Sequence, residues 1–248
     1  MTGTGPPSVL APTKPQRLQI SALGFSSADS RSDILSAISN PGYYRHEQVM
    51  AYFLRFLYSQ LFVRVPEPTS DFSGQTIVVT GSNTGLGREA AHIIVRLGAS
   101  KVILAVRSLE KGNAAAADIL KSLPASKAEI DVWTLDLADH ASIKAFADKA
   151  NTLPRLDAVI QNAAVYSHRF ESIGDDERHV AINVVGATLV GLQLLPKLRE
   201  TAKKLGVTTR LCFVGSDTMF FAQRGALPKS GSLLGVLNRP ETLAGDAR

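Results

Sequence analysis

The sequence predicts an α/β protein in which a doubly wound parallel sheet follows an N-terminal helical extension. From Phe72 onward, short apolar runs alternate with longer segments of helical periodicity. Strand and helix units at this spacing form right-handed crossovers, which place the strands parallel to one another. A glycine-rich turn directly follows the first apolar run, as in sheets that bind nucleotides. We therefore expect the strand order 3-2-1-4-5, with the last strands of such a sheet missing.

β-Branched residues define the first predicted strand, and an apolar stripe defines the helix after it. Residues 75–80 (QTIVVT) form a continuous run, which is typical of a strand buried on both faces. After the glycines, a helix is expected over 86–97. Its packing side carries Ala90, Ala91, Ile94 and Val95.

The same alternation then repeats. Residues 101–106 (KVILAV) predict the second strand, and the alanine-rich segment 109–122 predicts the second helix. Residues 129–135 (EIDVWTL) and 141–150 predict the third strand and helix. Each strand is thus followed by a helix that returns the chain across the sheet.

The last predicted units are a strand over 156–161, a long helix over 176–203 and a fifth strand over 210–214. Pro196 lies inside the helical pattern and is predicted to kink or break it. The carboxylates of residues 175–177 precede the long helix, so we expect them to interact with its N-terminal dipole.

Composition and charge exclude several function classes. The formal net charge is +5, but the basic residues are scattered, and the densest cluster, between Lys197 and Lys204, lies on one predicted helix. We therefore expect no nucleic-acid binding. The five histidines show no ligand spacing, so no metal site is expected. Cys212 is the sole cysteine, and its place in an apolar strand predicts a buried, inert thiol.

The chain divides into three predicted parts. Residues 1–44 are expected to be a disordered tail; residues 1–28 lack acids and are rich in Ser, Thr and Pro, which is also weakly typical of a transit peptide. A helix over 45–62 and a stiff Pro-Glu-Pro linker after it are expected within residues 45–70. Residues 71–248 are expected to form a Rossmann-like nucleotide-binding domain.

Residues 49–63 (VMAYFLRFLYSQLFV) leave two alternatives open. This apolar segment is interrupted by Arg55 and is short for a membrane span. It is expected either to pack on the domain, the alternative we favour, or to lie in a membrane interface as a peripheral contact. The expected location of the protein is cytoplasmic.

The turn Thr80–Gly87 (TGSNTGLG) has the composition of a phosphate-binding loop. Glycines permit a tight turn and let a diphosphate approach the N–H groups at a helix N-terminus. The spacing G-x-x-x-G-x-G differs from the dinucleotide fingerprint G-x-G-x-x-G, and no Lys-Ser/Thr follows as in a P-loop. We expect nucleotide binding here rather than a merely structural turn. The expected cofactor contacts are Gly81, Ser82, Asn83, Gly85, Leu86 and Gly87.

This turn and four later motifs, in the same order, resemble the short-chain dehydrogenase/reductase family, in particular its NADP-preferring fungal members. The later motifs are Asp136-Leu137, Asn162-Ala163-Ala164, Asn183 in Asn-Val-Val-Gly, and Val214-Gly215-Ser216. The resemblance covers about residues 72–217. It departs mildly from the family pattern at Gln161, where Asn is common, and at Ala164, where Gly is common.

The resemblance implies a role for each motif. Asp136 and Leu137 would contact the adenine, and Asn162 and Ala163 would shape the cofactor cleft. Ser216 would be the catalytic serine that orients the substrate carbonyl or hydroxyl. Asn183 would be the active-site asparagine that organises a proton-relay water.

Arg107, at the end of the second predicted strand, favours NADP(H) over NAD. A carboxylate at this place would accept hydrogen bonds from the ribose hydroxyls, whereas a guanidinium can hold a 2′-phosphate. The pattern from Arg107 to Lys111-Gly112 is similar to that of NADPH-preferring members of the family. The alternative is an exposed arginine that caps the strand.

The Tyr-x-x-x-Lys pair, which exchanges the proton in this family, does not occur in the printed chain. All five tyrosines precede Ser216. Residues 225–248 resemble an insertion that many fungal members carry between the serine and the tyrosine. We therefore expect a chain that is incomplete before its catalytic helix and last two strands, with an exposed sheet edge and poor solubility. A homodimer is in doubt for the same reason.

Three functions remain open. The first is hydride transfer between NADP(H) and a small carbonyl or alcohol substrate, which kinship implies to be a secondary metabolite of polyketide type. The second is a non-catalytic NADP-binding or interaction protein that lacks the proton donor. The third is membrane-associated reduction of a retinoid- or lipid-type substrate, which rests on residues 49–63 and on the pattern from Arg107 to Lys111-Gly112.

Overall fold

The computed structural model describes residues 46–64, 66–216 and 232–240, and gives only the backbone for 46–52. The predicted tail, 1–44, lies outside the described residues. The chain divides into one unit up to Val63 and a second from Arg64, and each is described by itself.

The described part of the first unit is the helix α2, His46–Phe62, which agrees with the helix predicted over 45–62. The rings of Tyr58 and Phe62, one turn apart, lie 5.4 Å from each other. Large apolar side chains are exposed along the helix, namely Phe53, Leu54, Phe56, Leu57, Tyr58, Leu61 and Phe62. Whether this helix packs on the domain or lies in a membrane interface stays a prediction.

The second unit is built on a five-stranded parallel sheet with the order β3-β2-β1-β4-β7. This confirms the predicted order 3-2-1-4-5, with β7 as the fifth strand of the sheet. The central strand β1 pairs with β2 on one side and with β4 on the other, so that Val78 lies between Ile103 and Val159. The strands are β1 (Thr76–Thr80), β2 (Lys101–Val106), β3 (Glu129–Thr134), β4 (Ala158–Gln161) and β7 (Arg210–Phe213).

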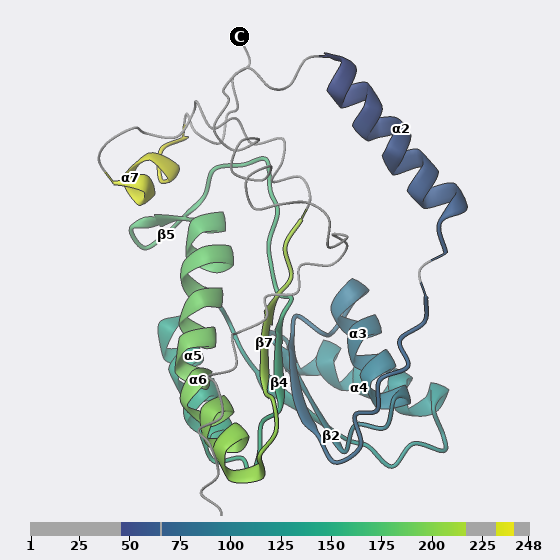
Figure 1. Cartoon of the computed structure of the whole chain (residues 1–248). Coiled ribbons are helices and arrows are strands. Elements are labelled where there is room, and N and C mark those ends of the chain that lie inside the picture. The colour runs from purple at the N-terminus through teal and green to yellow at the C-terminus, as the bar shows by residue number, and fades with distance from the viewer. Residues whose placement is uncertain (1–45, 65, 217–231, 241–248) are drawn as a thin grey trace, which may run out of the picture. The chain divides into compact units, whose positions relative to one another are not determined.

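Helices cover both faces of this sheet (Figure 1). The helices α3 (Gly85–Arg96) and α4 (Leu109–Ser122) pack on one face, around Ile77, Val79 and Leu104. The helices α5 (His140–Asn151) and α6 (Ala187–Leu205) pack on the other, where the core includes Val78, Phe146 and Leu194. Alternate side chains of a strand point to opposite faces of the sheet. Ile77 and Val79 of β1 therefore pack against α3 and α4, and Val78 packs on the face of α5 and α6.

The segment predicted as one helix over 176–203 is divided differently. A small hairpin of β5 (Ser172–Ile173) and β6 (Asp176–Glu177) comes first, followed by a π-helix, η1 (Val180–Gly186), and then α6. Gly174, with φ +59°, makes the hairpin turn. The predicted helix start at 176 was therefore wrong.

α6 continues through Pro196, so of the two outcomes predicted there, a break was wrong, and a kink stays a prediction. Proline removes one backbone N–H, but Pro196 and Leu192, whose carbonyl would have accepted that bond, are both exposed to solvent.

By length and composition, Val180–Leu205 is the one stretch of the described chain that could cross a membrane. Val190, Leu194 and Leu198 nevertheless fix it as the core helix of the domain.

β7 forms one edge of the described sheet, and its side chains are correspondingly open. Phe213 and Val214 are about half exposed. Cys212 is exposed, so the predicted buried thiol was wrong. The apolar run of residues 210–214 marked a strand correctly, but burial of a strand depends on a neighbour on each side, and β4 is the only described neighbour of β7.

Candidate functional site

The predicted site residues gather at the carboxyl edge of the sheet, where β1, β2, β3, β4 and β7 all end. β2 continues the sheet on one side of β1, and β4 continues it on the other. The strand order therefore reverses between β1 and β4. Ligands of open α/β sheets bind outside the strand ends at such a reversal.

Thr80 joins the end of β1 to the loop after β4. Its buried hydroxyl accepts hydrogen bonds from the backbone N–H groups of Asn162 and Ala163, both at 3.0 Å. In return, Asn162 Nδ2 donates to the Thr80 carbonyl, also at 3.0 Å. Thr80 belongs to the glycine-turn motif but was not among the predicted contact residues.

Two of the turn glycines are required by close packing. A Cβ on Gly81 would lie 2.8 Å from the Cα of Ala163, and one on Gly87 would lie 2.5 Å from Asn162 Nδ2. Gly81 also has φ +66°. These two glycines therefore let the turn and the loop after β4 lie against each other.

Gly85 differs from the other two. It has φ +56°, and a Cβ built on it would meet nothing within 4 Å. It begins α3, so its surroundings are open space at a helix N-terminus. This position suits the approach of a phosphate group to backbone N–H groups.

The other predicted residues of the turn take varied positions. Ser82 is buried, and its hydroxyl donates to the Val79 carbonyl at 2.8 Å, so its side chain serves the turn itself. Asn83 is half-buried, and Leu86 is 78% exposed.

On the β2 side of the reversal, two cations are exposed to solvent. Arg107 follows β2 directly, and Lys111 lies in the first turn of α4, where the Ser108 side chain caps the helix by accepting from the Lys111 N–H at 3.3 Å.

The end of β3 is braced by Asp136 and Leu137. Asp136 Oδ1 accepts from the Ala138 N–H at 3.0 Å, and its own N–H donates to Ser142 Oγ at 2.9 Å. Leu137 is buried in the core below α6. A Cβ on Gly186 would lie 2.2 Å from the Leu137 carbonyl, so the end of η1 touches the backbone here.

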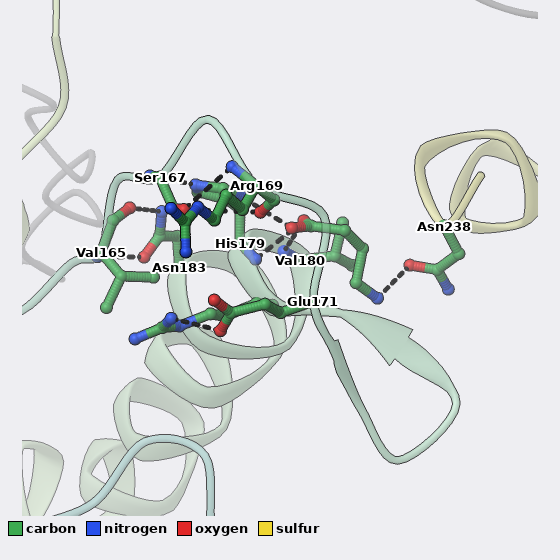
Figure 2. Close-up of polar contacts among 10 residues, drawn as sticks. Val165, Ser167, Arg169, Glu171, His179, Val180, Asn183 and Asn238 are labelled. Atoms are coloured by element: carbon green, nitrogen blue, oxygen red, sulfur yellow. Dashed lines mark hydrogen bonds and ion pairs between the residues drawn. The ribbon is translucent and has the colours of Figure 1, made fainter. Parts of the chain in front are cut away.

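On the β4 side, Asn183 holds the loop that follows β4 (Figure 2). Its Oδ1 accepts from the Val165 N–H at 2.8 Å, and its Nδ2 donates to the Val165 carbonyl at 2.9 Å. Asn183 lies in the middle of the π-helix η1. Such helices are rare and often occur at functional sites, because the wider turn redirects a side chain.

Glu177 and His179 hold the same loop one peptide further on, and sequence reasoning did not single them out for this. The His179 Nδ1 lies 2.6 Å from Glu177 Oε1, and its Nε2 accepts from the Ser167 N–H at 2.9 Å. Glu177 was predicted only as a helix-dipole partner; its carboxylate does accept from the N–H groups of His179 and Val180. Only the carboxylate run at 175–177 signalled this pair in the sequence.

Ser216 lies beyond the end of β7 and is exposed. β7 continues beside β4 as far as Val214, whose N–H donates to the Gln161 carbonyl at 2.9 Å. The structure thus brings Ser216 to the same edge of the sheet as Asn162 and Asn183.

Three groups with shifted pKa values lie at the opposite, amino edge of the sheet. Hydrogen bonds from Ser73 lower the pKa of Asp71. Burial works against the charge of Lys101, but hydrogen bonds to Glu129 and Asp131 outweigh it and raise its pKa. The hydrogen bond to Asp157 raises the pKa of Arg155. These pairs support the base of the sheet and not the candidate site.

A comparison with known protein families matches residues 75–220 to the short chain dehydrogenase family. A short chain dehydrogenase/reductase of Cryptosporiopsis sp. is 41% identical over 191 residues, which are 75% of this chain and 58% of that protein. A short-chain dehydrogenase of Penicillium roqueforti is 44% identical over 164 residues, which are 66% of this chain and 42% of that protein.

Among solved structures, a short-chain dehydrogenase from Sphingobium yanoikuyae in complex with NADPH has the same fold. Its TM-score is 0.52 at 20% identity, over 68% of this chain and 61% of that chain. The chain spans about half the length of the relatives that it matches. From the family match over more than half of its residues, the chain belongs to the short-chain dehydrogenase/reductase family of oxidoreductases.

Proposed function

We propose that this chain binds NADP(H) across the carboxyl edge of its sheet, and that the whole protein transfers a hydride between NADP(H) and a small carbonyl or alcohol substrate. The observation that carries the proposal is the junction of Thr80, Gly81 and Asn162 beside the open space at Gly85. The junction lies next to the N-terminus of α3 at the strand-order reversal, and the open space at Gly85 supports the binding of a diphosphate there.

The residues present fit such a cofactor in four places. The N–H groups at the start of α3 would bind the diphosphate. Arg107, with Lys111, would bind a 2′-phosphate through charge-assisted hydrogen bonds, which favours NADP(H) over NAD. Asp136 and Leu137 would flank the adenine, and Asn162 and Ala163 the other half of the cofactor.

When bound, the cofactor supplies the hydride or accepts it. The chain's own residues would orient the substrate: the Ser216 hydroxyl would donate a hydrogen bond to the substrate oxygen, and Asn183 would keep the loop after β4 in place beside it. Reduction of a carbonyl also needs a proton at the substrate oxygen. A serine hydroxyl is a poor acid, and the printed sequence holds no Tyr-x-x-x-Lys to supply that proton.

A second function therefore stands beside the first: a non-catalytic NADP-binding or interaction protein. The two share the cofactor site and differ only in turnover. For the whole protein we propose a small-molecule substrate, a secondary metabolite of polyketide type, on the ground of kinship with fungal relatives.

We further propose that residues 71–248 form the cofactor-binding domain and that 45–70 are a separate helix and linker; the division of the structure after Val63 supports this. We also propose that the protein is cytoplasmic, with residues 49–63 either packed on the domain or in peripheral contact with a membrane.

The test is a fluorescence titration of the purified chain with NADPH and NADH, followed by turnover of a panel of ketones. Saturable binding with preference for NADPH is expected. Binding with turnover selects the enzyme, and binding without turnover selects the second function. No saturable binding of either nucleotide would refute both.

A further inference from the structure

Three side chains connect the short helix α7 (Leu233–Leu237) to the loop after β4. Asn238, at the end of α7, contacts the hairpin strand β6. Glu177 of β6 contacts His179, and His179 contacts the loop at Ser167 (Figure 2). The contacts therefore link a segment beyond the serine motif to a loop at the candidate site.

Asn238 makes three hydrogen bonds with one amide group. Its Oδ1 accepts from the Glu177 N–H at 2.8 Å, and its Nδ2 donates to Asp176 Oδ1 at 2.7 Å and to the Asp175 carbonyl at 3.4 Å. The amide needs both its donor and its acceptor for this arrangement. An aspartate at 238 would keep the acceptor but lose the donor, and would face the Asp176 carboxylate.

Glu177 transmits the contact because it is nearly buried, with 2% exposure. Its carboxylate accepts from the N–H groups of His179 and Val180, at 2.7 and 3.2 Å, and from His179 Nδ1. The Ser167 N–H can only donate, so His179 Nε2, 2.9 Å away, is an acceptor. The proton of the neutral imidazole then lies on Nδ1, which faces the Glu177 carboxylate.

The loop is thus held at two alternate residues, Val165 and Ser167. The Asn183 side chain bonds to Val165. The His179 side chain, four residues earlier in the chain, bonds to Ser167. Tyr166 between them is 81% exposed. The same loop begins with Asn162 and Ala163 at the glycine turn, on the β4 side of the strand-order reversal.

We propose that Asn238 is a positioning residue of the cofactor and substrate site. It fixes residues 232–240 on Glu177 and, through His179, holds the loop 162–167 where the nicotinamide half of the cofactor and the substrate lie. This inference rests on the proposed function. The adenosine half lies on the other side of the reversal, near Arg107 and Asp136, and is independent of Asn238.

The experiment uses the full chain and two ligands that differ in one half. NADPH reaches both sides of the reversal, whereas adenosine 2′,5′-bisphosphate carries only the adenosine half. Asn238→Ala is expected to weaken NADPH binding about tenfold and to change bisphosphate binding less than twofold. Arg239→Ala, an exposed neighbour, is the matched control and should change neither. Amide exchange at 162–169 should be faster in Asn238→Ala and unchanged in Arg239→Ala.

A rescue separates positioning from general destabilisation. Asn238→Asp alone should weaken NADPH binding at least as much as Asn238→Ala, because it sets two carboxylates against each other. The pair Asp176→Asn with Asn238→Asp restores one donor and one acceptor in reversed roles. It should recover most of the NADPH affinity and the slow exchange of the loop.

Equal NADPH affinity and loop exchange in Asn238→Ala and the wild type would overturn the inference. So would a parallel loss of both ligands, or a double variant no better than Asn238→Asp. If the wild type binds neither ligand, the proposed function fails, while the exchange data still decide whether Asn238 holds the loop.

Discussion

Thr80 and Asn162 exchange two hydrogen bonds across the reversal of strand order. The Thr80 hydroxyl accepts from the Asn162 backbone N–H at 3.0 Å, and Asn162 Nδ2 donates to the Thr80 carbonyl at 3.0 Å. The glycine turn and the loop after β4 are therefore one structure. A ligand held by the turn is placed relative to the loop, which in turn is held by Asn183.

Replacing Thr80 tests this coupling. Thr80→Val keeps the shape but removes the acceptor, which leaves the N–H groups of Asn162 and Ala163 without it. We expect a loss of about 1–2 kcal/mol in the free energy of unfolding and a weaker affinity for NADPH. Thr80→Ser keeps the hydroxyl and should stay close to the wild type. Denaturant unfolding measures the free energy of unfolding, and titration measures the NADPH affinity. The same values of both quantities for Thr80→Val and Thr80→Ser would contradict the coupling.

The chain offers a matched pair for the phosphate position. Gly85 and Gly174 have φ +56° and +59°, and a Cβ on either meets nothing within 4 Å. Alanine at either should therefore cost a similar backbone strain of about 1 kcal/mol. Only Gly85→Ala should weaken NADPH binding, because only Gly85 borders the proposed diphosphate site. Equal nucleotide affinities for the two variants would remove Gly85 from the site.

Cofactor choice is tested at Arg107. Arg107→Asp replaces a cation that can bind the 2′-phosphate with an anion that repels it. We expect the ratio of NADPH to NADH affinity to fall at least tenfold. Lys121→Asp makes the same charge change on the last turn of α4 and serves as the control for overall charge. An unchanged ratio in Arg107→Asp would show that the arginine only caps β2.

Asp157 should matter for stability and not for binding. Its buried carboxylate accepts from the Thr76 N–H at 2.8 Å and from Arg155 Nε at 2.8 Å, at the amino edge of the sheet. Asp157→Ala leaves both donors without their acceptor, so unfolding should become easier by about 3 kcal/mol. NADPH affinity measured well below the melting temperature should remain that of the wild type. A weaker affinity there would mean that the two edges are coupled.

The exposure of Cys212 has a direct chemical test. The native chain should react with Ellman's reagent without denaturant and release one equivalent of thiolate. Cys212→Ser should release none. Reaction only after addition of denaturant would show that another part of the chain or a second molecule covers the β7 edge.

Local patterns were sufficient for most of the fold. Residues 101–106 and 109–122 form a strand and a helix at the predicted bounds, because a β-branched apolar run and an alanine-rich helical stretch are properties of neighbouring residues. The glycine turn was equally clear, because its close contacts demand residues without a Cβ. The sheet order followed from the alternation of strands and helices together with the glycine turn after the first strand, which is typical of a doubly wound nucleotide-binding sheet.

The tertiary structure decided the features that depend on residues far apart in the chain. A hairpin and a π-helix replaced the first turns of the predicted long helix. Asn238 contacts Glu177 at a sequence separation of 61 residues, which no local periodicity encodes. Whether Cys212 is buried depends on which strand lies beside β7.

By itself, the sequence therefore determined the family, the strand order and the turn at which a nucleotide would bind, because these arise from short motifs in a fixed order and from the alternation of strands and helices. Only the tertiary structure decided how the loop after β4 is held. That loop depends on the Asn183 amide, on the proton position of His179 and on a contact from α7, which become neighbours only when the sheet brings their elements to one edge.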